Sequence, residues 1–322
     1  MSVIAITGAS GYIGKHLVAE LVRIGGYEIR VLSRNKNQDL IDRKFDSSVE
    51  IIEGDLTDPV SIQLLLEPDC TVVNLAYLWE AGEAGNLEVT KHLLNACSTV
   101  RVARLIHCST AAVVGRAQEN RITEETPCHP FTEYGITKYK IEQAIAKKSR
   151  GYFDAVILRP TQVFGIAGIP LKIFANDLVH GSPWRNYAKS CLFGNRRMNL
   201  VHIANVVAAI IILIRYTKRF DGETIIVSDD DEPNNNFASV ERRLMQIFEI
   251  NEYPLPRLQL PLGLLSSLLT MLGRNNVNPR CNYDSGKLLS LGFKRPVDFN
   301  DGLDEYAVWY RSIFLDSGRA QL

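Results

Sequence analysis

The sequence predicts an α/β fold in which a doubly wound parallel sheet carries a smaller C-terminal domain. Short apolar runs alternate with amphipathic helical patterns from residue 2 to about residue 165, which is typical of parallel strands covered by helices on both faces. A glycine-rich turn joins the first of these strands to the first helix. After residue 165 longer helical stretches replace the alternation, which predicts a cap over the strand ends, where ligands bind in such sheets.

Each element of this fold rests on its own stretch of sequence. The apolar runs expected to form strands are residues 3–7, 28–33, 49–55, 71–76, 104–109 and 155–160. Amphipathic helical patterns cover residues 15–25 and 89–100. Residues 201–213 and 224–229 predict a helix and a strand that return to the sheet. We therefore expect a sheet domain at 1–165, with later returns near 197–230, and a domain at 166–322 that mainly binds substrate.

The composition excludes several classes of protein. The 36 basic and 36 acidic side chains balance, which gives no support to nucleic-acid binding, because that requires a basic surface. The six cysteines are scattered and the histidines lack metal-ligand spacing, so we expect no disulfide framework and no metal site. No signal peptide or membrane-spanning segment is expected, and a reducing cytoplasm suits the chain. His107 and His202 lie within apolar strand patterns and are expected to be core residues.

The most apolar stretch after residue 165 is 258–274. Pro261 and Gly263 interrupt it, and it ends at Gly273 and Arg274, so we expect a helix that covers part of the core. A helix lying on a membrane surface is the alternative, although the segment lacks the lysine-rich polar face that such helices usually have.

The first loop has the pattern of a phosphate-binding turn. In VIAITGASGYIGKHLVAEL a strand, three spaced glycines and a helix follow one another. Small residues allow the backbone to approach a pyrophosphate, and the helix N-terminus offers free N–H groups and a positive dipole. An ordinary strand-to-helix turn is the alternative, but the context on both sides favours a dinucleotide site. The residues expected to contact the dinucleotide here are Gly8, Ser10, Gly11, Tyr12, Ile13 and Gly14.

The end of the second predicted strand favours NADP(H) over NAD(H). NAD sites usually place an acidic residue here to accept from the ribose hydroxyls, but this chain has Ser33 and Arg34, with Lys36 just beyond. A guanidinium can pair with a 2′-phosphate, whereas an acid would repel it. Plain loop charges are the alternative for Arg34 and Lys36. After the third strand, Asp55 is a candidate acceptor for the adenine amino group or a cap for the next helix.

Two pairs in the sequence have the spacing Tyr-x-x-x-Lys. Tyr134 and Lys138 stand at the predicted start of a helix in TEYGITKYKIEQ, which places them on one face. Tyr283 and Lys287 have the same spacing in CNYDSGKLLS, which contains no glycine cradle and is interpreted as a turn leading into a helix. The neighbouring pair of Tyr139 and Lys140 is not expected to carry chemistry.

The order of the motifs resembles that of a known family. The stretches TGASGYIG, GDLTD, NLAY, STAAVVG, YGITK, RPTQVFG and LVHIANVVAAI occur between residues 2 and 215 in the order found in extended short-chain dehydrogenases/reductases, the NAD(P)-dependent epimerase/dehydratase group. The resemblance implies a Rossmann fold and a catalytic set of Thr110, Tyr134 and Lys138, with Ser109 as a structural neighbour. It also implies dinucleotide contacts at Leu56, Leu75 and Ala76 in addition to Tyr134 and Lys138, and in many members a dimer formed partly by the helix after Tyr134.

The chemistry of this set follows from the residue types. A ketone that accepts hydride needs a proton, and a phenol with a pKa near 10 gives one up reluctantly. We expect the Lys138 ammonium, one helical turn away, to lower the pKa of Tyr134 toward neutrality together with the charge of an oxidised nicotinamide. Thr110 would hydrogen-bond the substrate oxygen and hold it near the phenol.

On the substrate side, the resemblance implies a nucleotide-diphosphate sugar and a role in polysaccharide biosynthesis. Gln162 replaces the usual asparagine, Asn205 the usual aspartate, and Met198 a frequent arginine, which weakens a UDP-galactose-type epimerase. The run NRRMNLVHIANV looks like that of bacterial nucleotide-sugar 4-ketoreductases, in which Arg196 and Arg197 would clamp the diphosphate, or else form a solvated pair. The residues expected to contact the substrate are Tyr77, Thr110, Gln162, Arg196 and Arg197.

The first hypothesis is therefore NADPH-dependent reduction of a 4-keto nucleotide sugar. An epimerase or dehydratase using the same site is an alternative, but Ala111 and Ala112 replace the Asp-Glu pair that dehydratases of the family carry after the threonine. Reduction of a small non-sugar ketone is a further alternative. A non-catalytic NADP-sensing or scaffold protein would have no need of the proton donor.

Overall fold

A seven-stranded parallel sheet forms the centre of the molecule. The computed structural model describes residues 2–34, 49–273 and 277–316. The strands lie in the order β10-β7-β5-β4-β1-β2-β3, and all neighbours are parallel. The strands of the sheet are β1 Ser2–Thr7, β2 Tyr27–Ser33, β3 Val49–Glu53, β4 Thr71–Asn74, β5 Arg104–Cys108, β7 Asp154–Pro160 and β10 Glu223–Val227. The six predicted strands and the predicted returning strand are therefore confirmed.

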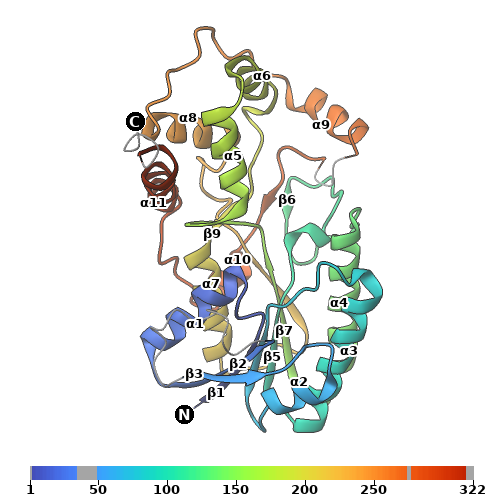
Figure 1. Ribbon diagram of the computed structural model, residues 1–322. Helices are drawn as coiled ribbons and strands as arrows, with labels where there is room; N and C mark the ends of the chain where they lie inside the picture. The colour runs from blue at the N-terminus through green and yellow to red at the C-terminus, as the bar shows by residue number, and fades with distance from the viewer. Residues whose placement is uncertain (1, 35–48, 274–276, 317–322) are drawn as a thin grey trace.

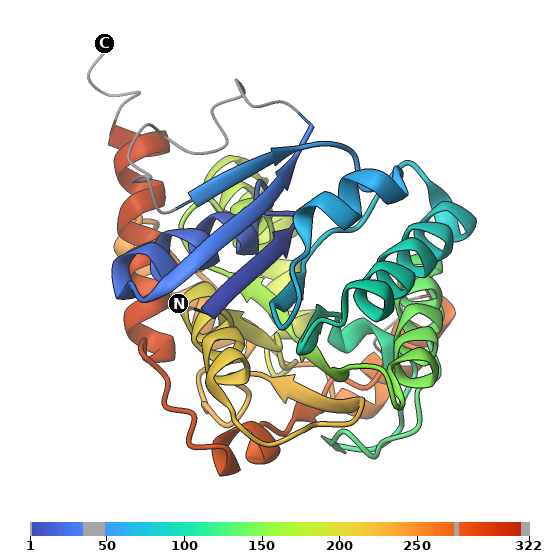
Figure 2. The same ribbon diagram turned by 90° about the horizontal axis from the view of Figure 1, so that it is seen from below.

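Helices cover both faces of the sheet (Figure 2). On one face α1 (Tyr12–Ile24) packs against the returning helix α7 (Ile203–Arg215), and both bury apolar side chains on the strands. The other face carries α2 (Pro59–Leu65), α3 (Gly82–Val100) and α4 (Glu133–Ser149). The sheet residues between the two layers are fully buried, as Ile4, Ile6 and Val72 illustrate. Such two-sided burial explains why the strands are apolar runs rather than alternating patterns.

The helices begin where the sequence supplies caps. Asp58 accepts hydrogen bonds from Val60 N and Ser61 N, and Pro59 occupies the first turn of α2. Thr132 Oγ1 accepts from Gly135 N at 3.2 Å and starts α4 two residues before Tyr134. The predicted position of Tyr134 in the first turn of a helix is thus confirmed.

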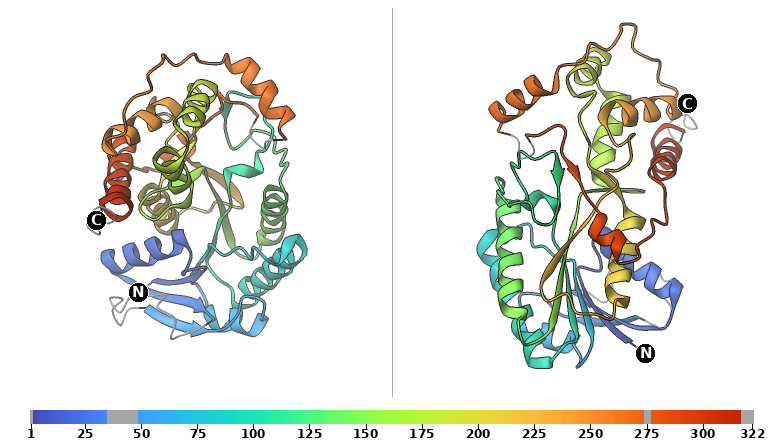
Figure 3. Two further views of the ribbon diagram at one scale, coloured as in Figure 1. Left: turned by 45° about the horizontal axis from the view of Figure 1, so that its top comes forward. Right: turned by 180° about the vertical axis from the view of Figure 1, so that it is seen from behind.

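A cap stands at one end of the sheet, away from the N-terminus (Figures 1 and 3). Its own core packs aromatic and aliphatic side chains such as Phe164, Leu244, Phe299 and Tyr306. The helices of the cap are α5 Ile169–His180, α6 Pro183–Phe193, α8 Phe237–Ile247, α9 Leu262–Met271 and α11 Phe299–Tyr310. Two short strand pairs and a short helix join the cap to the sheet: β8 Gln162–Phe164 with β9 Leu200–His202, β6 Arg121–Ile122 with β11 Asn282–Tyr283, and α10 Gly286–Ser290.

The helix expected within 258–274 is α9, which is shorter than the apolar stretch. Leu265 and Leu269 are buried, as a helix covering the core requires, but Leu264 and Met271 are exposed. Arg274 lies outside the described residues. Over the described part of the chain, none of the helices combines the length and apolarity needed to cross a membrane.

Chain order reverses between β1 and β4, because β2 and β3 lie on one side of β1 and the later strands on the other. At such a switch point the loops leave in opposite directions and open a crevice outside the carboxyl ends of the strands. The candidate site lies in this crevice, under the cap.

Candidate active site

The loop between β1 and α1 needs its glycines. Gly8 has φ of +72°, and a Cβ there would lie 2.8 Å from Ala76 N, at the end of β4. A Cβ on Gly14 would lie 2.3 Å from Gly8 O, so the first turn of α1 could not pack against the loop. Gly11, at the N-cap of α1, has no side chain to cap the helix, so the first N–H groups of α1 are left for a ligand in the crevice.

A cavity of about 540 Å³ extends from this loop along the crevice. It brings together every residue that the sequence predicted for dinucleotide binding. These are Gly8, Ser10, Gly11, Tyr12, Ile13, Gly14, Ser33, Arg34, Asp55, Leu56, Leu75, Ala76, Tyr134 and Lys138. Tyr77 also lines this cavity, together with Cys108 and Ser109. The lining of the cavity fits a dinucleotide, because it combines an uncapped helix N-terminus, which can bind phosphate, with the basic side chains of Arg34 and Lys138.

Arg34 and Asp55 stand at the ends of adjacent strands in this cavity. Asp55 Oδ1 accepts from Thr57 N at 2.8 Å and from Thr57 Oγ1 at 2.7 Å. These bonds, and more weakly the Arg34 guanidinium, lower the pKa of Asp55. The proposed cap role belongs to Asp58 instead, because Asp55 closes its own turn and α2 begins four residues later. Lys36 lies outside the described residues.

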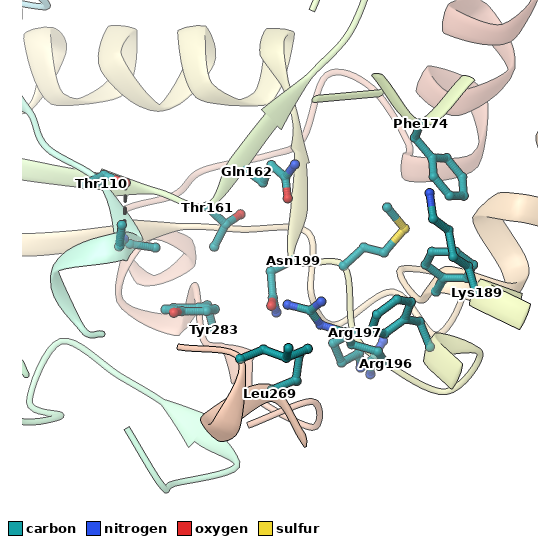
Figure 4. A pocket seen from close by; sticks show the side chains of 16 residues that line it. Thr110, Thr161, Gln162, Phe174, Lys189, Arg196, Arg197, Asn199, Leu269 and Tyr283 are labelled. Carbon is teal, nitrogen blue, oxygen red and sulfur yellow. Dashed lines mark hydrogen bonds between the residues drawn. The ribbon is translucent and has the colours of Figure 1, made fainter. Parts of the chain in front are cut away.

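Tyr134 and Lys138 line this cavity, and Thr110, which lines a neighbouring cavity, lies close to the Tyr134 hydroxyl. Lys138 Nζ donates to the carbonyl of Cys108, at the end of β5, over 2.9 Å. Thr110 begins a 3-10 turn, and its Oγ1 accepts from Ala112 N at 3.2 Å (Figure 4). Thr110 lies close enough to the Tyr134 hydroxyl to lower the pKa of the phenol. A strand end, a turn and a helix thus hold the three side chains in one place.

Burial is the largest influence on the pKa values of Tyr134 and Lys138. Burial raises the pKa of the Tyr134 phenol, and the interaction with Thr110 offsets only part of that rise. Burial also lowers the pKa of Lys138, which is 3% exposed. The protein groups alone therefore do not move the pKa of Tyr134 toward neutrality. The expected shift, which includes the charge of an oxidised nicotinamide, stays a prediction. The phenol remains protonated, which is the form that a proton donor requires.

Aromatic rings surround the phenol. Tyr77 meets the Tyr134 ring edge to face at 5.0 Å between centroids, and Lys138 Nζ lies 5.3 Å from the centre of the Tyr77 ring. Trp79 stacks on Tyr134 at 5.2 Å with 18° between the planes. The sequence analysis did not identify Trp79, whose only signal was its place shortly after the NLAY motif.

A second cavity of about 600 Å³ lies between Thr110 and the cap (Figure 4). It contains four of the five predicted substrate residues, Thr110, Gln162, Arg196 and Arg197, whereas Tyr77 belongs to the first cavity. The side chains that sequence reasoning missed here come from the cap and from β11. They are Phe174, Lys189, Phe193, Phe237, Leu269, Leu272 and Tyr283, and Thr161 and Asn199 join them from the end of β7 and the start of β9. Weakly patterned helices supply most of them, so only the tertiary fold brings them together.

The second cavity is basic and apolar. Its lining includes Lys189, Arg196 and Arg197 but no Asp or Glu among the described residues. Arg197 Nη1 donates to the carbonyl of Glu232 at 2.8 Å, which fixes its guanidinium at the wall. Lys189 pairs with Asp177 at 2.5 Å, outside the lining set. This wall can therefore receive an anionic group beside an aromatic surface.

The other predicted residues fall into structural roles. His107 and His202 are 1% and 4% exposed, and His107 Nδ1 lies 3.1 Å from Asn74 Nδ2, so both are core residues as expected. Lys287, in α10, pairs with Glu223 at 3.0 Å. Tyr283 lies in β11, a short strand separated from α10 by two residues, rather than in a turn, and its side chain lines the second cavity. Lys140 pairs with Glu83 at 2.7 Å across α4 and α3. Among the described residues there is no cluster of His, Cys, Asp or Glu that could hold a metal ion.

Comparisons with known proteins agree with this architecture. A model of the NAD dependent epimerase/dehydratase family matches residues 4–227. The dTDP-D-glucose 4,6-dehydratase of Mus musculus is 25% identical over 97% of this chain and 89% of its own length. Sterol demethylase protein B of Methylococcus capsulatus is 24% identical over 89% of this chain and 88% of its own. The UDP-glucuronic acid 4-epimerase of Bacillus cereus, solved in complex with NAD, has the same fold, with a TM-score of 0.74, 20% identity and 98% of each chain covered.

Proposed function

Because the chain belongs to the NAD-dependent epimerase/dehydratase family, we propose that it is an NADPH-dependent reductase that acts on the 4-keto group of a nucleotide-diphosphate sugar. The observation that carries the proposal is the placement of Thr110, Tyr134 and Lys138 where the crevice cavity meets the cap cavity. A proton donor at this junction can reach a carbonyl held from the cap side while the dinucleotide lies along the sheet.

The cofactor proposed is NADP(H), with NAD(H) as the alternative. The glycine loop and the α1 N-terminus would hold the pyrophosphate, and Arg34 would pair with the 2′-phosphate. Lys138 would bond the nicotinamide ribose. When bound, the reduced nicotinamide supplies the hydride. The solved structure named above holds NAD, and Arg34 is the feature of this chain that favours the phosphorylated form.

Each of the three proposed catalytic residues would have a different role, set by its position. Thr110 would hold the substrate oxygen near the phenol, and Tyr134 would transfer its hydroxyl proton to that oxygen. Lys138 stands one turn along α4 and would stabilise the phenolate that remains. The uncharged Ala111 and Ala112 beside Thr110 supply no acid or base for elimination of water, which argues against a dehydratase.

The substrate proposed is a nucleotide-diphosphate sugar. Arg196 and Arg197 would bind the diphosphate, Gln162 the sugar-phosphate region, and the phenylalanines of the cap cavity an aromatic base. A nucleotide-sugar epimerase that keeps NAD(P) bound would use the same residues and remains the alternative reaction. Like many members of the family, the protein would form a homodimer partly through α4, the helix that begins beside Tyr134.

A second candidate is reduction of an apolar non-sugar ketone. Phe174, Phe193, Phe237 and Leu269 give the cap cavity a largely apolar wall. The similarity to a protein named sterol demethylase protein B, over most of both chains, also favours an apolar ketone as the substrate.

To test the proposal, the protein is incubated with NADPH and a panel of nucleotide 4-ketosugars, and the absorbance of the reduced cofactor is followed. Stoichiometric NADPH consumption with a 4-keto sugar supports the reductase. Inversion of a nucleotide sugar without net consumption supports the epimerase, and consumption only with apolar ketones supports the second candidate. The matched control is Tyr134→Phe, and turnover that survives this substitution would exclude Tyr134 as the proton donor.

A further inference from the structure

Trp79 is a large apolar side chain that the fold leaves uncovered at the crevice. It lies between β4 and α3, is 75% exposed, and lines the cavity that contains the glycine loop and Lys138. A tryptophan can bury 150–250 Å² of surface, so leaving one in water forgoes a large stabilisation. Such a residue at the wall of a cavity points to a ligand that covers it.

The loop that carries Trp79 is fixed rather than loose. Asn86, which is 4% exposed in α3, accepts from Leu78 N at 3.0 Å. Its Nδ2 donates to the carbonyls of Leu78 and Gly82, each at 2.8 Å. A single buried amide thus clamps the backbone directly before the tryptophan. The exposed indole is therefore held in place, which lowers the entropy cost of binding against it.

Part of the Trp79 indole already packs against two tyrosine rings of the site. Trp79 stacks on the ring of Tyr134 at 5.2 Å and meets Tyr77 edge to face at 4.9 Å. Tyr77 in turn contacts both Tyr134 and the Lys138 ammonium. Both rings thus pack against the proton donor, and Trp79, most of whose surface stays open, also lines the cavity.

We propose that Trp79 is a contact for the dinucleotide at the Tyr134 end of the crevice and, through its stack on the phenol, a positioning residue for proton transfer. The inference rests on the proposed function, because it takes a nicotinamide dinucleotide as the occupant of this cavity. The cofactor would cover the open side of the indole, and the indole would keep water from the phenol and hold its ring beside Thr110.

The binding part is tested with tryptophan fluorescence and acrylamide, which quenches exposed indoles by collision. The chain has three tryptophans, and Trp184 on α6 is a matched control because it is also exposed, at 67%, but does not line the cavity. We expect saturating NADP⁺ to reduce acrylamide quenching in the wild type and in Trp184→Phe, and to leave quenching unchanged in Trp79→Phe. Calorimetry on the same samples reports whether the dinucleotide binds.

Two outcomes separate this inference from the function on which it rests. If NADP⁺ binds but leaves acrylamide quenching of the wild type unchanged, the contact with Trp79 is wrong while the reductase proposal stands. If neither NADP(H) nor NAD(H) binds the wild type, the proposed function falls and the contact falls with it.

The positioning part is tested by comparing Trp79→Ala with Trp79→Phe. The alanine should weaken NADPH binding about three- to tenfold, as loss of an aromatic contact does, and the phenylalanine should restore most of it. Reduction needs the protonated phenol, so its rate falls at high pH. Because burial raises the pKa of Tyr134, loss of the indole should move this fall to lower pH in Trp79→Ala but not in Trp79→Phe. An unmoved pH profile together with unchanged NADPH affinity in Trp79→Ala would overturn the proposal.

Discussion

Tyr134 and Lys138 depend on contacts with the ends of two strands. Lys138 Nζ donates to the last carbonyl of β5, Tyr134 lies near Thr110 just beyond that strand, and Tyr77, which packs on Tyr134, follows β4. The pair at Tyr283 and Lys287 has the same spacing, but its lysine pairs with Glu223 instead. At the scale of single residues, the two pairs therefore differ in the neighbours that the sheet supplies, not in the four-residue interval.

Replacing Tyr134 by phenylalanine should abolish proton donation without emptying the site. The ring keeps its stack with Trp79, so NADPH affinity should stay close to that of the wild type. We expect the rate of ketone reduction to fall by about 10²–10⁴-fold, the usual contribution of a general acid. Single-turnover kinetics with NADPH measure the rate, and calorimetry measures the binding. A change below tenfold would assign the proton to another donor.

Arg34 should decide between the two nicotinamide cofactors. Loss of a charge-assisted hydrogen bond to a 2′-phosphate in Arg34→Ala should weaken NADPH binding by roughly ten- to hundredfold and change NADH binding little. Dissociation constants for both cofactors in both proteins provide the measurement. Lys15 in α1, which is exposed but does not line the crevice cavity, offers Lys15→Ala as the control. Equal losses for NADPH and NADH would show that Arg34 does not read the phosphate.

At the scale of elements, the sequence predicted the strands, the glycine loop and the first turn of α4, because each depends on local pattern and on strand ends that must meet at one edge. It did not predict the cap cavity or Trp79. Phe174, Phe237 and Leu269 come from three helices whose contacts are far apart in sequence. The position of Trp79 depends on the clamp from Asn86, which no periodicity reveals.

Asn205 shows how a departure from the family pattern is explained by packing. It lies in α7 and is fully buried, and its Nδ2 donates to both carboxylate oxygens of Asp229 after β10, at 3.1 and 3.0 Å. Its amide also exchanges hydrogen bonds with the backbone of Val297. An aspartate at 205, as in the family pattern, would place two carboxylates in contact without water.

The pairing of Asn205 with Asp229 predicts the result of a double-mutant cycle. Asn205→Asp alone should lower the free energy of unfolding by about 3 kcal/mol near neutral pH, because it buries a second carboxylate against Asp229, whose charge already pairs with Arg295 at 2.9 Å. Adding Asp229→Asn again places one amide opposite one carboxylate, now with the two residue types interchanged. The double mutant should therefore recover a large part of the lost free energy of unfolding. Urea denaturation of the four proteins measures the coupling. Additive effects would mean that the two side chains do not interact as the hydrogen bonds indicate.

At the scale of the whole molecule, the sheet and cap are joined where the two cavities end. Asp230, just after β10, is fully buried, and its carboxylate accepts from groups on three other segments. The donors are Asn199 Nδ2 at 2.6 Å, Asn235 Nδ2 at 3.0 Å and Tyr283 N at 2.8 Å. Asn199 and Tyr283 also line the cap cavity. One carboxyl group thus ties the returning strand to the wall of the substrate cavity.

This joint should make stability depend on pH in a defined direction. Burial raises the pKa of Asp230 from its ordinary 3.8 to about 7. Between these values the unfolded chain has lost the proton that the folded chain keeps, so the contribution of Asp230 to stability falls as the pH rises. The free energy of unfolding of the wild type minus that of Asp230→Asn should therefore decrease by up to about 1.4 kcal/mol per pH unit from pH 4 to 7 and level off above. Urea denaturation of both proteins across this range measures the difference. A difference that stays constant, or that grows as the pH rises, would show that the folded protein holds Asp230 ionised and that its three neutral donors, with Arg197 nearby, outweigh the loss of water.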